Sequence, residues 1–280
     1  MKYIKKTYRA GATIEVWKTY RREGRHHGGG AGRGGETPET MARYNAKLSY
    51  REMTRTINAN FGPDDLYLTP TYRKGERPAT PEDFRRDRET FLAALRRLYK
   101  REGIALKYII AYGYGKRGAP HLHLIVSGID PRKIARLWHR GSIYAVNLYD
   151  NREYSGLAWY LHNQSRIDPA TGQEMTGRRW SGSRNLVRPQ PQVEEVSAKR
   201  WREPPQSVKG YIIDPDSIDA GTSPVSGMPY LFYRLLRLPP NPHAMTPDGR
   251  LLRDDDAEKW LRQQNAAEVR RKFHTEKRRC

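Results

Sequence analysis

Cysteine is almost absent from this sequence, since the only one, Cys280, is the last residue. One cysteine excludes a disulfide framework and a cysteine-based zinc site. Long apolar runs are also lacking, and no segment approaches the length of a membrane-spanning helix. The first residues, MKYIKKTYRAG, contain no apolar stretch of the kind that a membrane anchor requires. We therefore expect a cytoplasmic protein with no membrane partner.

Acidic residues are too few to balance the basic ones. The chain carries 52 Lys and Arg against 31 Asp and Glu, a formal net charge of +21. An excess of this size indicates a polyanionic partner, and nucleic acid is the first expectation. A phosphate-binding loop of the form G-x-x-x-x-G-K-S/T is missing as well, so the sequence predicts no ATP-driven unwinding.

Composition divides the chain into four predicted segments. Residues 1–36 are rich in Arg and Gly and predict a disordered basic arm. Residues 37–200 alternate between helical and strand patterns and form the predicted main domain. Residues 201–240 are an extension of uncertain packing, and residues 241–280 predict a helix with a basic tail.

Hydrophobic periodicity predicts an α+β fold for the main domain. Helices are expected over 37–61, 80–102, 130–138 and 151–166, and strands over 64–75, 106–112, 121–128 and 143–148. SVKGYII and YLFYRLLRL predict further strands that follow this domain. The order of elements favours a central antiparallel sheet with flanking helices.

Two histidines flank a leucine on one of these strands. Because side chains alternate along a strand, His121 and His123 should leave one face of the sheet while Leu122 points into the core. Two neutral imidazoles placed in this way can share a divalent ion. The alternative is that both are simply polar residues on a solvated strand face.

The order of motifs along residues 37 to 190 resembles the HUH endonuclease superfamily, and within it the rolling-circle replication initiators of bacterial plasmids, phages and integrated elements. INANFGPDDLYLTPTY is similar to the first motif of the family and GKRGAPHLHLIV to its metal motif. YSGLAWYLHNQSR is similar to its tyrosine-bearing helix, and RRWSGSRNLVRP to a basic segment that often follows.

The resemblance implies a ferredoxin-like or RRM-like sheet in which His121 and His123 hold Mg²⁺ or Mn²⁺. A tyrosine would attack a phosphodiester of single-stranded DNA in an origin hairpin, leaving a 5′-phosphotyrosyl link and a free 3′-OH that primes synthesis. A host helicase and polymerase would complete replication in a bacterial cytoplasm. Members usually carry an acidic or amide third ligand before the hairpin, where LKYIIAYGYGKRG offers Tyr112, Gly113 and Tyr114, so the third ligand stays unassigned.

Helical phase separates the candidate nucleophiles among 18 tyrosines. Tyr154 lies within the apolar stripe of its predicted helix, whereas Tyr160 is turned away from that stripe by about 110° at 100° per residue. Tyr160 also matches the tyrosine position of the family, and we expect it to be catalytic. Tyr154 and Tyr149 remain the alternatives.

Basic and aromatic residues near these motifs are candidate DNA contacts. Arginine and lysine would follow the phosphate backbone, and tryptophan would offer a stacking plane. The candidates are Lys116, Arg117, Arg178, Arg179, Trp180 and Arg184.

Two other functions remain open at this point. A relaxase or a single-tyrosine transposase would use the same histidine pair and tyrosine, although in relaxases the tyrosine precedes the histidines. A non-catalytic nucleic-acid-binding protein would bind DNA without a divalent ion and would form no covalent adduct.

Overall fold

The computed structural model divides the chain into two compact units. The central unit is Tyr50–Arg188, and the terminal unit combines Met1–Ser49 with Pro189–Cys280. The structure describes residues 2–21, 37–115, 119–149, 153–167, 172 and 177–278. No helix in these ranges is both long enough and apolar enough to cross a membrane.

The central unit is built on a five-stranded sheet in the order β6-β3-β5-β4-β7, in which every neighbouring pair is antiparallel. The strands are β3 (Leu66–Tyr72), β4 (Tyr108–Tyr114), β5 (Pro120–Val126), β6 (Gly141–Asn147) and β7 (Trp180–Gly182). The helices are α1 (Pro38–Asn60), which crosses the boundary between the units, α2 (Pro81–Arg101), α3 (Pro131–Ala135) and α4 (Ser155–His162), and a 3-10 turn spans Lys74–Glu76. The predicted α+β class with an antiparallel sheet and flanking helices is confirmed.

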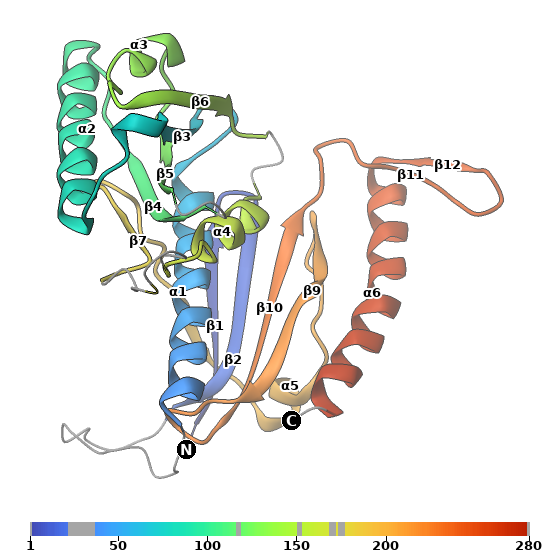
Figure 1. The fold of residues 1–280 in the computed structure, drawn as a ribbon. Helices are drawn as coiled ribbons and strands as arrows, with labels where there is room; N and C mark the ends of the chain where they lie inside the picture. The colour runs from blue at the N-terminus through green and yellow to red at the C-terminus, as the bar shows by residue number, and fades with distance from the viewer. Residues whose placement is uncertain are drawn as a thin grey trace. The chain divides into compact units, whose positions relative to one another are not determined.

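Helix α2 covers one face of this sheet (Figure 1). It begins where the Thr80 hydroxyl accepts a hydrogen bond from the backbone N–H of Asp83, and Pro81 fits the first turn because its missing N–H is not needed there. Its apolar stripe includes Phe91 and Leu95, which pack against Leu122 and other inward residues of the strands. Burial of this stripe holds α2 to the sheet.

The opposite face is only partly covered by apolar packing. Met53 and Ile57 of α1 pack with Ala158 and Leu161 of α4 over Ile125 and its neighbours. At the other end of β5 the same face carries His121 and His123, which belong to neither apolar cluster of the central unit. The helices therefore leave a polar end of the sheet beside α4.

The terminal unit contains a second five-stranded sheet, in the order β8-β1-β2-β10-β9. Its strands are β1 (Lys2–Ala10), β2 (Thr13–Arg21), β8 (Gln192–Glu195), β9 (Tyr211–Thr222) and β10 (Pro229–Arg237), and α5 (Ala198–Arg202) follows β8. Helix α6 (Asp254–Arg278) packs Val269 and Phe273 on this sheet alongside β9, after the small hairpin of β11 (His243–Met245) and β12 (Leu251–Arg253) (Figure 1).

The expectation of a disordered arm is wrong for residues 2–21, which form β1 and β2 with an antiparallel register from Lys2–Arg21 to Ala10–Thr13. Ile14 and Val16 alternate into the core against β10, and this burial stabilises the hairpin despite its many lysines. The rest of the predicted arm, 22–36, lies outside the described residues. The two later predicted strands are confirmed as β9 and β10, and they join this sheet rather than that of the central unit. The predicted main domain, 37–200, therefore does not coincide with either unit.

Candidate active site

The two histidines lie side by side on β5 as predicted. Leu122 between them is fully buried on the opposite face, and the imidazole centroids of His121 and His123 are 4.7 Å apart with nearly perpendicular planes. His123 is 1% exposed, whereas His121 is half-buried. The pair thus presents two ring edges toward one small region of the sheet face.

His123 is held by the neighbouring strand β3. Its Nδ1 is 2.6 Å from the hydroxyl oxygen of Tyr67 and 3.5 Å from that of Thr69. Its Nε2 is buried and, within the described residues, has no hydrogen-bond partner. Burial, followed by the nearby His121, lowers the pKa of His123 to about 3, so the ring is neutral at physiological pH. A neutral imidazole with one nitrogen held and the other free is the form that ligates a metal.

His121 faces a residue that the sequence analysis did not single out. Its Nδ1 lies 3.2 Å from the carbonyl oxygen of Ala119, and its Nε2 lies 3.3 Å from Oε1 of Gln164. Gln164 follows α4, and its Nε2 donates a hydrogen bond of 2.8 Å to the carbonyl oxygen of Tyr160. If Nδ1 of His121 donates to Ala119, the lone pair of Nε2 faces the amide oxygen of Gln164. Two facing acceptors of this kind fit a cation between them.

These atoms fit a divalent ion better than any acidic cluster does. Among the residues that the structure describes, no group of three or more His, Cys, Asp or Glu side chains is placed to hold a metal. Nε2 of His121, Nε2 of His123 and Oε1 of Gln164 form a mixed imidazole and amide donor set. Such a set suits Mg²⁺ or Mn²⁺ when water fills the remaining positions.

Tyr160 and Tyr154 have the orientations that helical phase predicted. Tyr154 is fully buried just before α4, and its hydroxyl donates a 3.0 Å hydrogen bond to the carbonyl of Tyr149. Tyr160 is 47% exposed, and its ring centroid lies 5.3 Å from that of His123. Tyr149 is equally exposed, but its ring packs on Tyr154. The structure therefore brings Tyr160, rather than Tyr154, to the histidine pair.

The predicted DNA contacts are only partly in view. Lys116 and Arg117 lie outside the described residues. Arg178 and Arg184 are exposed, so both are free to meet a phosphate backbone. Arg179 is half-buried, and its guanidinium reaches the carbonyl of His162 at 3.4 Å. These assignments stay predictions.

Trp180 does not offer the stacking plane that we expected. It is 8% exposed and belongs to the apolar cluster beneath α1 and α4, with the Arg188 guanidinium 5.9 Å from its ring centroid. The expectation failed because Trp180 lies in β7, paired with Ala111 of β4, and its side chain points to the covered part of the sheet.

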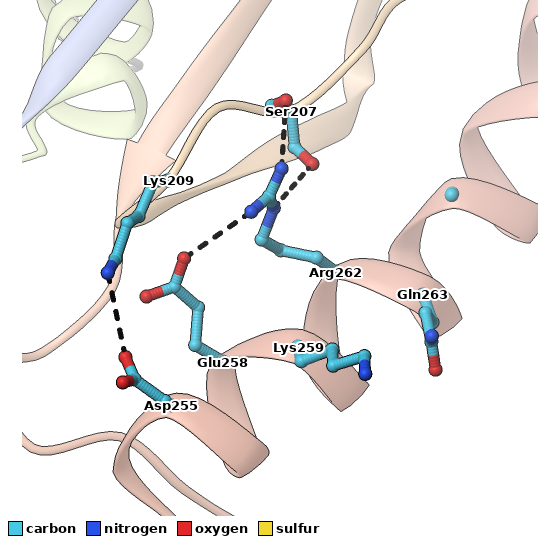
Figure 2. Close-up of a pocket in the computed structure, with 8 residues that line it drawn as sticks. Ser207, Lys209, Asp255, Glu258, Lys259, Arg262 and Gln263 are labelled. Carbon is cyan, nitrogen blue, oxygen red and sulfur yellow. Dashed lines mark hydrogen bonds and ion pairs between the residues drawn. The ribbon is translucent and has the colours of Figure 1, made fainter.

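The terminal unit has an open cavity of about 450 Å³ beside α6, shown in Figure 2. Its charged groups already have partners: Arg262 bonds Ser207 and lies 3.5 Å from Glu258, and Lys209 lies 3.8 Å from Asp255. The cavity holds no histidine, cysteine or tyrosine among its lining residues. Its ion pairs fasten α6 to the segment before β9, which is a structural role.

Comparison with known proteins identifies one family in the central unit. Residues 65–165 match the family model of the replication-associated protein ORF2. This span contains β3, the histidine pair, Tyr160 and Gln164. The match supports a replication initiator. Comparisons with curated proteins and with solved structures gave no match.

Proposed function

We propose that this protein is a metal-dependent endonuclease that nicks single-stranded DNA with Tyr160 and thereby starts rolling-circle replication of a mobile element. One observation carries the proposal. An exposed tyrosine lies against a buried, neutral histidine whose Nε2 has no partner within the described residues, in the segment that matches a replication-associated family.

The residues of the site divide the work between them. His121, His123 and Gln164 would hold Mg²⁺ or Mn²⁺, which when bound polarises a phosphate oxygen and offsets charge at the reacting phosphorus. Tyr67 fixes the ring of His123 through Nδ1, which leaves Nε2 turned to the ligand position. Gln164 is in turn fixed by the carbonyl of Tyr160.

The tyrosine exchanges one phosphodiester for another. The hydroxyl oxygen of Tyr160 forms a bond to phosphorus as the bond from phosphorus to the 3′-oxygen breaks. Tyrosine loses its proton and the departing 3′-oxygen gains one, so charge and atoms balance. The products are a 5′-phosphotyrosyl link and a 3′-OH that a polymerase can extend, and the link retains the energy needed to rejoin the strand.

Covalent capture of DNA tests the proposal. The full chain would be incubated with labelled single-stranded oligonucleotides that tile the origin region of its element, with Mn²⁺ or with EDTA, and resolved on a denaturing gel. We expect a protein–DNA band with Mn²⁺ only, and mass spectrometry of its peptides should place the nucleotide on Tyr160.

Each other outcome favours a named alternative. DNA binding that does not depend on Mn²⁺, without any covalent band, would overturn the proposal in favour of a non-catalytic DNA-binding protein. A covalent band with strand transfer between two element ends, but no replication from the 3′-OH, would favour a transposase or relaxase.

Tyr67→Phe is expected to weaken Mn²⁺ binding by about 10- to 100-fold, because the hydrogen bond that orients His123 is lost while the ring remains. Isothermal titration of the DNA-free protein with Mn²⁺ measures this affinity directly. Tyr108→Phe is the matched control, since the Tyr108 hydroxyl bonds Arg96 and does not touch a histidine. Equal affinity for the two variants would contradict the role given to Tyr67.

A further inference from the structure

An exposed tyrosine stands on the edge strand next to the candidate active site. Tyr144 lies on β6, the first strand in the order β6-β3-β5-β4-β7, and is 63% exposed. Its neighbours Ile143 and Ala145 pack against the core under α2. Tyr144 therefore points to the opposite face, where its ring adds little to the packing.

The register places Tyr144 on the face that carries the histidines. Tyr144 pairs with Thr69 of β3, and residues directly opposite each other in adjacent strands share a face. The hydroxyl of Thr69 is in turn 3.5 Å from Nδ1 of His123. Two strand spacings, about 10 Å, separate β6 from β5, a distance that a few nucleotides can span.

The hydroxyl groups of this face converge. Burial is the main reason that the pKa of Tyr67 is raised, and the hydroxyls of Tyr160 and Tyr144 raise it further, which shows that both lie near it. Thr71 and Ser142 continue the face outward along β3 and β6; both are exposed, and their hydroxyl oxygens are 3.1 Å apart. An open polar strip with one aromatic ring thus leads from the tyrosine and histidines to the edge of the sheet.

We propose that Tyr144 is a stacking platform for an unpaired DNA base, and that it positions the nucleotides beside the phosphodiester that Tyr160 attacks. This inference rests on the proposed function, because it takes single-stranded DNA as the ligand. An aromatic ring exposed on a sheet surface stacks bases of any sequence, and hydroxyl groups around it can donate to phosphate or sugar oxygens. The buried Trp180 cannot serve in this way, so Tyr144 takes the role that the sequence analysis gave to that residue.

The test compares DNA with and without bases. Binding of a fluorescent dT20 and of a 20-nucleotide abasic strand would be measured by anisotropy for wild type, Tyr144→Ala and Tyr144→Phe. We expect Tyr144→Ala to weaken binding of dT20 by about 5- to 100-fold, the range that loss of one base–aromatic stack produces. Tyr144→Phe keeps the ring and should bind within about twofold of wild type.

The abasic strand separates stacking from charge. Wild type and Tyr144→Ala should bind it equally, because phosphate contacts remain and no base is present to stack. Equal binding of dT20 by wild type and Tyr144→Ala would overturn this inference, and so would an equal loss on both strands. If wild type captured origin DNA covalently while Tyr144→Ala bound dT20 normally, only the stacking role would fail. If wild type formed no covalent adduct, the proposed function would fail instead.

Discussion

Tyr160→Phe is expected to lower the rate of single-strand nicking by at least about a thousandfold, because the attacking oxygen is removed while the ring is kept. Tyr160 is 47% exposed and its hydroxyl lies outside the apolar core, so the variant should unfold at nearly the wild-type temperature. Its affinity for single-stranded DNA should change by less than about threefold, since backbone contacts dominate that affinity. A loss of chemistry with unchanged binding is the result that identifies a nucleophile.

Two other tyrosines provide the controls for this measurement. Tyr154→Phe removes a buried hydroxyl that bonds the carbonyl of Tyr149, so a stability loss of about 1 kcal/mol is expected while nicking continues. Tyr149→Phe should leave both stability and nicking near wild type. Continued adduct formation by Tyr160→Phe, together with its loss in Tyr149→Phe or Tyr154→Phe, would move the nucleophile to that position.

Sequence patterns predicted the central unit well because its order is local. The apolar spacing of α2, the alternation around Leu122 and the phase difference between Tyr154 and Tyr160 are each set within one helix or strand. The structure gives these residues the burial that each pattern predicts. The catalytic and metal-binding roles remain proposals, because burial and orientation do not measure chemistry.

The N-terminal hairpin was missed for a physical reason. KYIKKTYRA and TIEVWKTYR are rich in Thr, Tyr and β-branched residues, but they precede a Gly- and Arg-rich stretch that dominated the average composition of residues 1–36. β2 pairs with β10, where Val16 lies opposite Tyr233, more than two hundred positions along the chain. Partners at such a separation leave no local periodic signal. The alternation of Ile14 and Val16 is the signal that would have indicated a strand.

Gln164 was missed because its role depends on where a helix ends. α4 ends at His162, and the chain then turns so that the amide of Gln164 points to His121 on a strand about forty positions earlier. A glutamine after a helix has no distinctive spacing. The same applies to Trp180, whose burial follows from the pairing of β7 with β4 and not from its own neighbours.

Replacing both His121 and His123 by alanine is expected to weaken Mn²⁺ binding by more than about a hundredfold and to abolish metal-dependent nicking. Loss of an outer partner such as Tyr67 costs about 10- to 100-fold, and removal of two of the three donor side chains should cost more. Mn²⁺ titration without DNA measures the affinity, and the covalent gel assay measures nicking.

The control must separate loss of a ligand from loss of the fold. His139→Ala removes an exposed histidine of the same unit and should leave both Mn²⁺ affinity and nicking unchanged. In the double variant the hydroxyl of Tyr67 loses its partner His123, so a stability loss of about 1–3 kcal/mol is expected, and thermal unfolding in EDTA would measure it. A folded double variant that still bound Mn²⁺ as wild type does would show that the ion is held elsewhere. A folded double variant that bound no Mn²⁺ but nicked DNA at the wild-type rate would remove the metal from the mechanism and leave Tyr160 to act without it.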